Sequence, residues 1–201
     1  MKVLVACEYS GIVREAFRAK GHDAYSCDLL DTEIQGNHIQ GDVLSILDQE
    51  WDLMIAHPPC TYLTCTGNRW FKPEYRERFP TRQQDRLDAI EFFKKLYFAP
   101  IEKICIENPV GIMSSILRKP DQIIQPYEFG HTEAKKTCLW LKNLPYLIPT
   151  DFREPEYITY KSGKRMAKWY AEAVNLPKQE RMKIRSKTFQ GIANAMAEQW
   201  G

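Results

Sequence analysis

The stretch Lys2-Val3-Leu4-Val5-Ala6-Cys7-Glu8-Tyr9-Ser10-Gly11 decides the fold class, because it carries the chain from an apolar run directly toward a helix. The run Lys2–Cys7 is short and rich in Val, which predicts a buried strand. Ser10 is a preferred cap residue, and we expect it to begin a helix that ends near Lys20, just before Gly21. Apolar residues recur along that helix at helical spacing: Val13, Ala16 and Phe17.

The alternation of strand and helix continues along the chain. Further apolar runs predict strands at Asp23–Cys27, Trp51–Ala56, Ile104–Ile106, Gln122–Gln125 and Cys138–Leu141. The remaining spacing predicts a short helical turn at Val43–Leu47 and helices at Arg82–Phe98, about Met166–Val174 and Phe189–Trp200. In the longest helix we expect the inward residues to be Leu87, Ile90, Phe93, Leu96 and Tyr97. Strands that alternate with helices imply an α/β fold with a mostly parallel central sheet and helices on both faces.

Composition sets the class of protein. The chain has 201 residues, which suits one α/β domain over 1–201. Hydrophobic residues make up 44% and charged residues 27%, and no apolar run approaches the roughly 18 residues that span a bilayer. Because a strand begins at Lys2, we expect no signal peptide, a cytoplasmic location and no membrane partner.

The cysteines are scattered singly rather than in CxxC pairs. In a cytoplasmic protein, six such residues are expected to be thiols, and no metal site is predicted from them. Cys7, Cys27 and Cys105 fall in or beside predicted strands, where they would act as small hydrophobic residues.

The polar residues of interest share one position in the fold. Glu8, Asp28, His57–Cys60 and Glu107 each follow a predicted strand. In parallel sheets, ligands bind at the carboxyl ends of the strands. We therefore expect one site at this edge of the sheet.

The segment Thr61–Pro80 is aromatic, basic and irregular, and a loop of this length is more often functional than idle. Arg69 and Trp70 within it are candidates for clamping and stacking on a substrate, although packing of the loop explains them equally. Net charge is only +2, so overall charge does not indicate nucleic-acid binding. Basic residues are concentrated in this loop and in two later stretches, around 161–168 and 178–187.

Cys60 and Glu107 together suit alkylation at carbon 5 of a pyrimidine. That carbon is a poor nucleophile until a thiolate adds at carbon 6 and an acid engages the N3 edge of the ring. The reaction therefore needs a Cys and a nearby carboxyl group. Pro58 and Pro59 would stiffen the backbone that holds the thiol. His57 is either a structural residue or one that orients the Cys60 loop; Cys65 and His131 receive no role.

The order of these motifs resembles the C5-cytosine DNA methyltransferase family along most of the chain. The segment from Ala6 to Gly11, followed by Val13–Phe17, resembles the first motif, which is the cofactor loop and its helix. Asp28 matches the acidic residue that holds the ribose hydroxyls in the family. Gly41-Asp42-Val43 resembles the third motif, whose Asp contacts the adenine amino group.

The later motifs follow in order. His57-Pro58-Pro59-Cys60 with Thr66-Gly67 resembles the catalytic motif, and Glu107-Asn108-Pro109 resembles the Glu-Asn-Val motif, whose Glu engages the flipped base. The stretch Gln190–Met196 is similar to the Gly-Asn-Ala-Val motif, which includes Asn194 here.

The resemblance implies a class I methyltransferase (Rossmann-like) fold, S-adenosylmethionine as the cofactor and DNA as the partner. Cys60 and Glu107 would be catalytic. The residues that it implies for the cofactor pocket are Glu8, Tyr9, Ser10, Gly11, Asp28, Asp42, Pro58 and Asn194.

The sequence also departs from the family. The first motif keeps only Gly11 of its several glycines. Glu133-Ala134-Lys135-Lys136-Thr137 stands where the family has Gln-x-Arg-x-Arg, so Lys135 replaces an arginine as a point charge without its bidentate fork. Only about 143–185 is available for substrate recognition, too little for the usual reader of the major groove. DNA, RNA or a free nucleotide, cytosine or uracil, and an oligomer that shares substrate contacts all stay open.

Two other classes of protein share part of this pattern. Methyltransferases of exocyclic amines place Asp, Asn or Ser before Pro-Pro and an aromatic residue after it, whereas His57-Pro58-Pro59-Cys60 has neither. A catalytically degenerate nucleic-acid- or nucleotide-binding relative fits the lost glycines, but such a binder has no need for both Cys60 and Glu107.

Overall fold

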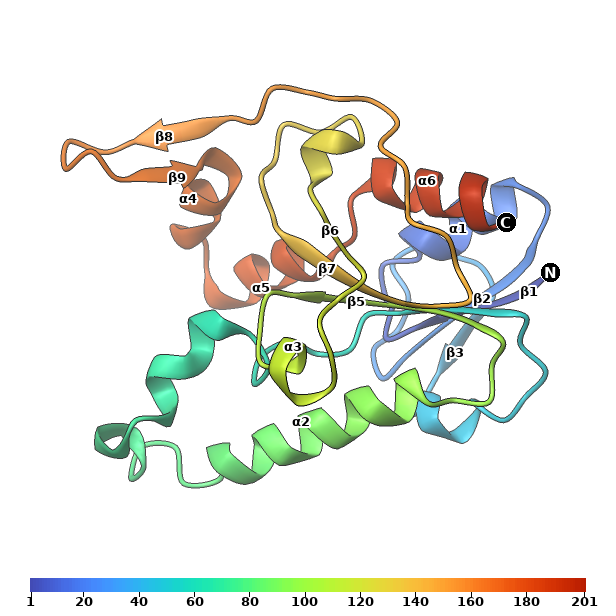
Figure 1. Ribbon diagram of the computed structural model, residues 1–201, viewed down its shortest axis with the longest axis horizontal. Coiled ribbons are helices and arrows are strands. Elements are labelled where there is room, and N and C mark those ends of the chain that lie inside the picture. The colour runs from blue at the N-terminus through green and yellow to red at the C-terminus, as the bar shows by residue number, and fades with distance from the viewer.

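The computed structural model describes residues 1–201 and is built on a seven-stranded sheet of order β3-β2-β1-β4-β5-β7-β6 (Figure 1). Its strands are β1 (Lys2–Ala6), β2 (Asp23–Asp28), β3 (His38–Gln40), β4 (Leu53–Ala56), β5 (Lys103–Pro109), β6 (Gln122–Ile124) and β7 (Thr137–Lys142). The strands from β3 to β5 pair in parallel, and β7 is antiparallel to both of its neighbours. The predicted α/β fold with a mostly parallel sheet is confirmed.

Helices cover both faces of this sheet (Figure 1). Helices α1 (Ile12–Ala19) and α6 (Gln190–Trp200) pack together on one face, and α2 (Arg82–Tyr97) lies on the other. The shorter helices are α3 (Met113–Ile116), α4 (Lys168–Val174), α5 (Lys178–Ser186) and the 3-10 turns η1 (Val43–Ser45), η2 (Cys65–Phe71), η3 (Pro73–Tyr75) and η4 (Pro126–Glu128). A separate hairpin joins β8 (Tyr157–Thr159) and β9 (Arg165–Ala167).

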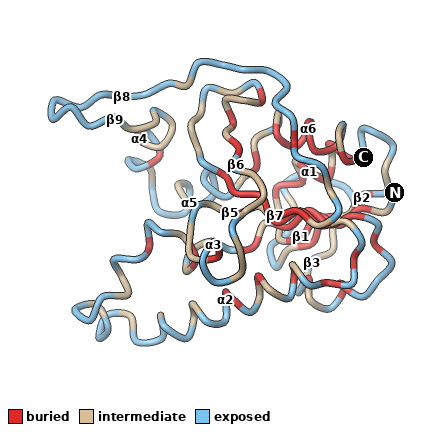
Figure 2. Tube along the Cα trace, viewed as in Figure 1, coloured by how far each residue is buried: buried red, intermediate tan, exposed pale blue.

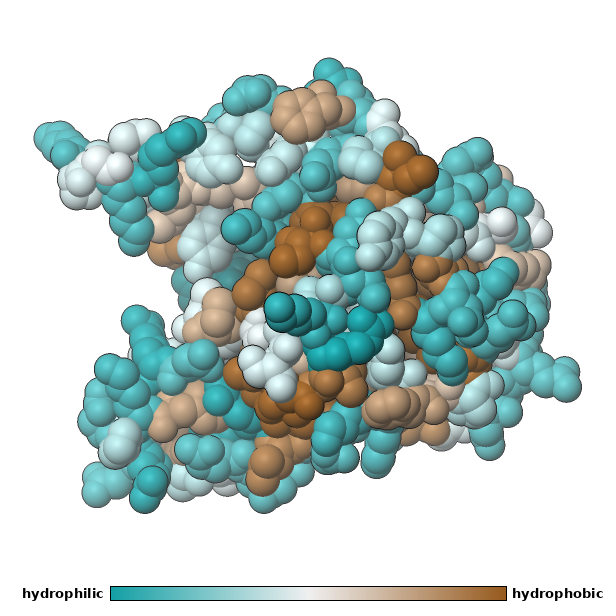
Figure 3. Space-filling model, in the orientation of Figure 1, coloured by the Kyte–Doolittle hydropathy of each residue, from teal (hydrophilic) through white to brown (hydrophobic).

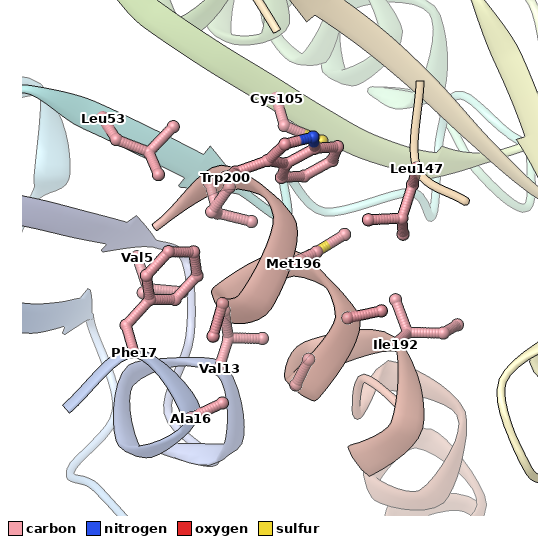
Figure 4. Close-up of a cluster of buried hydrophobic side chains, with 14 of the residues drawn as sticks. Val5, Val13, Ala16, Phe17, Leu53, Cys105, Leu147, Ile192, Met196 and Trp200 are labelled. Carbon is pink, nitrogen blue, oxygen red and sulfur yellow. The ribbon is translucent and has the colours of Figure 1, made fainter. Parts of the chain in front are cut away.

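Alternate residues of each central strand fill two cores, because successive side chains of a strand point to opposite faces. Val3, Val5, Leu53, Ile55 and Cys105 pack toward α1 and α6, where Phe17, Met196 and Trp200 meet them (Figure 4). Leu4, Ala6, Met54, Ala56 and Ile106 pack toward α2 with Phe93 and Trp140. The strands are therefore buried on both faces, and exposed chain lies in the surrounding loops and arms (Figure 2).

The start of α1 is held by Glu8 rather than by the predicted cap Ser10. The buried Glu8 carboxylate accepts the N–H groups of Val13 at 2.7 Å and Arg14 at 3.2 Å. Ser10 Oγ donates to the same carboxylate at 3.2 Å and receives only a long 3.4 Å bond from the N–H of Ile12. A carboxylate at a helix N-terminus satisfies free donors and is favoured by the helix dipole.

Several predicted boundaries and positions change in the structure. Leu87 is 55% exposed, so its predicted inward position is wrong; Ile90, Phe93 and Leu96 are buried as predicted. Helix α4 begins only at Lys168, because Arg165–Ala167 pairs with Tyr157–Thr159 in the hairpin. The segment 61–80 contains two 3-10 turns, so its prediction as wholly irregular is wrong. Strand β3 and helices α3 and α5 were not predicted.

The cysteines and the helices bear on two expectations from composition. All six cysteines are free thiols, and Cys27 and Cys105 are buried in β2 and β5 as predicted. Burial raises the pKa of the Cys27 thiol to about 11, with Asp28 and Asp42 adding to the effect. None of the helices combines the length and apolarity that a membrane span requires.

We predict that replacing Glu8 by Ala lowers the free energy of unfolding by about 2 kcal/mol, because buried N–H groups at the start of α1 lose their acceptor. Urea unfolding followed by circular dichroism measures the change. Asp23→Ala is the matched control, since Asp23 is exposed and its side chain makes no hydrogen bond. Equal stability of the Glu8 variant and the control would contradict the capping role.

Candidate active site

The site forms where β4 and β5 end side by side. Ala56 pairs with Ile106 in parallel register, so the next residues, His57 and Glu107, stand opposite each other. Both follow residues that face α2, so their side chains turn toward the face that α1 and α6 cover, where they meet: His57 Nδ1 lies 3.0 Å from Glu107 Oε2. Asn108 Nδ2 donates to the Pro58 carbonyl at 2.8 Å, which ties the two strand exits together.

Cys60 lies just beyond this junction on a tight turn. Its carbonyl accepts the N–H groups of Leu63 and Thr64, both at 3.0 Å, and its side chain is half-buried. Burial and the negative charge of Glu107 raise the pKa of the Cys60 thiol, whereas the positive charges of Lys135 and Arg185 lower it. The net shift is upward, so formation of the thiolate depends on nearby positive charge.

The surroundings of Glu107 favour its ionised form despite its burial. Burial raises the pKa of its carboxyl, but the hydrogen bond from His57 and the positive charge of Lys135 more than offset this, and the pKa is lowered. Lys135 stands with Glu107, Thr137, Thr188, Phe189 and Ile192 around a small hollow. The positive charge of Lys135 therefore acts on the pKa of both Cys60 and Glu107.

Helix α5 forms the outer wall near Cys60, and its role was missed in the sequence. It buries none of its side chains, so it carried no apolar periodicity from which to predict a helix. The Arg185 carbonyl accepts Lys135 Nζ at 3.1 Å, and Tyr9 Oη lies 2.9 Å from Ser186 Oγ. Lys183 and Lys187 each approach a carboxylate oxygen of Glu33 at 2.5 Å. Arg185 lies in the basic stretch 178–187, for which the sequence predicted no role.

Asp28 and Asp42, two of the residues that we expect around the cofactor, lie near each other at the edge of the sheet. The charges of Asp28 and Asp42 both reach the Cys7 thiol, where they add to burial in raising its pKa. Gly11 has φ of +75°, and a Cβ there would lie 2.7 Å from Arg14 Nη2, so no other residue fits without rearrangement. Asp42 is exposed and Asp28 half-buried, each accepting a backbone N–H of its own loop.

Other residues expected to contact the cofactor have internal partners in this structure. The carboxylate of Glu8 and the hydroxyl of Ser10 are used at the start of α1, and Tyr9 reaches α5. Buried Pro58 offers only its carbonyl, to Asn108. Asn194 lies on the exposed face of α6, and its side chain accepts a hydrogen bond from Gln190.

His131 has a structural contact and no place beside the candidate catalytic residues. Its Nε2 accepts the N–H of Gly191 at 2.9 Å, which fixes the start of α6. Gly191 packs so closely that a Cβ would collide with the Phe129 carbonyl oxygen, which explains a glycine at this helix start.

Arg69 and Trp70 lie in the outer loop, where aromatic rings and guanidinium groups stack on one another. The Arg69 guanidinium is 4.1 Å from the Trp70 ring centroid, and Tyr75 and Phe79 contact that ring edge-on. Arg86 anchors the loop to α2 through the Tyr62 carbonyl at 3.1 Å and Asn68 Oδ1 at 2.8 Å. Cys65 is exposed in this loop.

Comparisons with known proteins support the fold. No family model matches the chain, and no curated protein matches it either. A solved structure from E. coli, described as a candidate DNA modification methyltransferase encoded within a prophage, superposes on 89% of this chain with a TM-score of 0.50 and 15% sequence identity. This chain spans 56% of the length of that structure's chain. At such identity the likeness establishes the fold: a Rossmann-like sheet of the methyltransferase type.

We predict that Lys135→Gln slows alkylation of Cys60 by iodoacetamide several-fold at pH 8. Loss of the positive charge raises the pKa of the thiol further, so less thiolate is present at a given pH and the rate profile moves to higher pH. Mass spectrometry of a Cys65→Ser background isolates Cys60 from the exposed thiol. Lys136→Gln makes the same charge change at an exposed neighbour; an equal effect of both variants would exclude a local role for Lys135.

Proposed function

We propose that this chain is an S-adenosylmethionine-dependent methyltransferase that modifies carbon 5 of a pyrimidine in nucleic acid, with cytosine in DNA as the first candidate. The observation that carries the proposal is the placement of a half-buried thiol, Cys60, and an ionisable carboxyl group, Glu107, just past the ends of two paired parallel strands, where the charge of Glu107 acts on the pKa of the thiol. The family resemblance assigns these same residues to the chemistry, and the methyltransferase-type fold is compatible with it.

The proposed reaction begins at the thiol. The Cys60 thiolate forms a bond to carbon 6 of the ring, and the ring electrons move toward N3, where Glu107 supplies a proton that it has first taken up from solvent. When bound, the cofactor would supply a methyl group to carbon 5, and its sulfonium sulfur would keep the electron pair of the broken sulfur–carbon bond. Removal of the carbon-5 proton by a base returns the electrons that break the bond between sulfur and carbon 6.

The cofactor side of the site has suitable chemistry in the loops after β1, β2 and β3. Asp28 and Asp42 offer carboxylates for ribose hydroxyls and an adenine amino group, and Gly11 lets the backbone turn closely at the first loop. Because Glu8 and Ser10 are used inside the loop, we assign them to supporting it rather than to direct contact. Asn194 on α6 stays a proposed contributor, as does the Pro58 backbone.

Two basic arms flank the approach to Cys60. The loop 61–80 and the hairpin of β8 and β9 extend on the same side of the molecule, with a notch between them (Figures 1 and 3). The hairpin region 157–171 carries four basic side chains, Lys161, Lys164, Arg165 and Lys168, and no acidic one. Tyr157 and Tyr160 are exposed beside them, at 40% and 43%. Cations with exposed aromatic rings suit a nucleic-acid strand.

We assign the substrate-recognition role to these arms within a reduced region of about 143–185. So small a region favours an unpaired or extruded base over sequence-specific reading of a duplex, since carbon 6 is inaccessible inside a stacked helix. Closure of the loop 61–80 over the bound base, with Arg69 and Trp70, would exclude water.

We predict that Cys60→Ser abolishes methyl transfer while cofactor binding persists. Labelled S-adenosylmethionine is offered with duplex DNA, single-stranded DNA, RNA and free pyrimidine nucleotides, and Cys65→Ser serves as the matched thiol control. A 5-fluorocytosine substrate should trap a covalent adduct on Cys60, because fluorine at carbon 5 blocks proton removal. Full transfer by Cys60→Ser would refute the mechanism; cofactor-independent nucleic-acid binding without transfer would favour the degenerate binder.

We also predict that a Lys161→Gln, Lys164→Gln double variant weakens single-stranded DNA binding and makes it less salt-dependent. The logarithmic salt slope should fall in magnitude by about 1.4 if both lysines contact phosphates, at about 0.7 for each contact. Fluorescence anisotropy over a salt series measures it. Lys94→Gln, Lys95→Gln on α2 is the control with the same loss of charge, and a similar slope change there would remove the hairpin from the interface.

A further inference from the structure

His57 is a buried residue with one partner and one free nitrogen. Its side chain is 8% exposed, and Nδ1 lies 3.0 Å from Glu107 Oε2. Nε2 is buried and has no hydrogen-bond partner in the protein. No hydrogen bond joins His57 to Cys60, so its influence on the site passes through Glu107.

The partner atom determines where the ring proton lies. An ionised carboxylate can only accept, so the Glu107 carboxylate requires the proton on His57 Nδ1. The neutral ring then leaves a lone pair at Nε2. A second ring proton would place an N–H group at a buried position without an acceptor, which is costly. The surroundings therefore favour a neutral ring that donates from Nδ1.

The other groups around Glu107 do not replace this contact. Lys135, in the segment before β7, contributes positive charge. The negative charge of Glu107 in turn raises the pKa of the Cys60, Cys105 and Cys138 thiols, none of which hydrogen-bonds it. Among them His57 alone hydrogen-bonds a carboxyl oxygen of Glu107. The hydrogen bond from His57 therefore occupies Oε2 of Glu107 and leaves Oε1 without a hydrogen bond.

We propose that His57 is a positioning residue that holds Glu107 Oε2 through Nδ1–H and so presents Oε1 alone to the pyrimidine edge. The inference rests on the proposed carbon-5 chemistry. Glu107 first takes up a proton from solvent at Oε1, while Oε2 keeps the hydrogen bond from His57. When the Cys60 thiolate adds to carbon 6, the ring nitrogen N3 takes that proton from Oε1, and the carboxylate that results is again stabilised by the His57 N–H. The proton count of His57 does not change during the step.

The test uses a matched pair of variants. The amide nitrogen of Asn reaches the place of a histidine Nδ1, whereas that of Gln reaches the place of Nε2. His57→Asn should therefore keep the hydrogen bond to Glu107, and His57→Gln and His57→Ala should lose it.

Two nuclear magnetic resonance readouts are independent of activity. In the ¹⁵N-histidine-labelled chain at pH 7, His57 should carry its proton on Nδ1 with Nε2 bare. Titration of the ¹³C-labelled Glu107 carboxyl should move to higher pH in His57→Gln and His57→Ala, because burial is then less opposed, and stay near wild type in His57→Asn. A proton on Nε2 alone, or on both nitrogens, in the wild type would overturn the proposal even if the variants fail to fold.

The kinetic readout is the rate of adduct formation between Cys60 and a 5-fluorocytosine oligonucleotide in the presence of S-adenosylmethionine. We expect His57→Gln and His57→Ala to be slower by about tenfold or more, and His57→Asn to recover most of the rate. Equal rates for Asn and Gln would overturn the positioning role. Absence of any adduct in the wild type, with the Nδ1 tautomer present, would instead refute the carbon-5 chemistry itself.

Discussion

The site depends on the parallel pairing of β4 with β5. This register places His57 opposite Glu107 and sends both chain exits to one edge, where Asn108 holds the Pro58 carbonyl. A slip of one residue would turn Glu107 toward the α2 face and separate it from His57. The two apolar cores hold the register, because Leu53, Ile55 and Cys105 fill one face and Met54, Ala56 and Ile106 fill the other. The chemistry of the edge is thus positioned by hydrophobic packing beneath it.

Burying a carboxylate beside a thiol creates an electrostatic conflict that the surroundings resolve. The negative charge of Glu107 opposes ionisation of Cys60, and burial opposes ionisation of both. Positive charge arrives from chain segments that are distant in sequence: Lys135 before β7, and Arg185 on α5. The site is therefore complete only when the C-terminal third of the chain has folded back onto the sheet edge. The reactivity of the Cys60 thiol thus depends on the packing of helix α5 beside it.

Much of this arrangement could be predicted from the sequence. Apolar runs such as Leu53–Ala56 and Ile104–Ile106 can be recognised from a few neighbouring residues, although the strands that they form pair with distant parts of the chain. These runs predicted where the strands end and therefore where Cys60 and Glu107 lie. What could not be predicted depends on contacts between distant segments. Ser10 satisfied the local rule for a cap, but Glu8 reaches the same donors from a buried position. Helix α5 has no apolar face, so periodicity could not reveal it, and the bond between His57 and Glu107 follows only from strand register.

Helix α5 buries none of its side chains and is attached to the rest of the chain mainly by charged groups, above all by the ion pairs of Lys183 and Lys187 with Glu33. Ion pairs in solvent weaken as salt shortens the Debye length from about 10 Å at 0.1 M to about 3 Å at 1 M, whereas the packing of the cores does not depend on such pairs. High ionic strength therefore loosens this wall and withdraws Arg185 from Cys60, which leaves the thiol harder to ionise. Salt therefore affects the ionisation of the Cys60 thiol as well as the binding of a nucleic-acid strand. The number of counterions released on binding would be overestimated if it were calculated from the salt dependence of the turnover rate rather than of the binding constant.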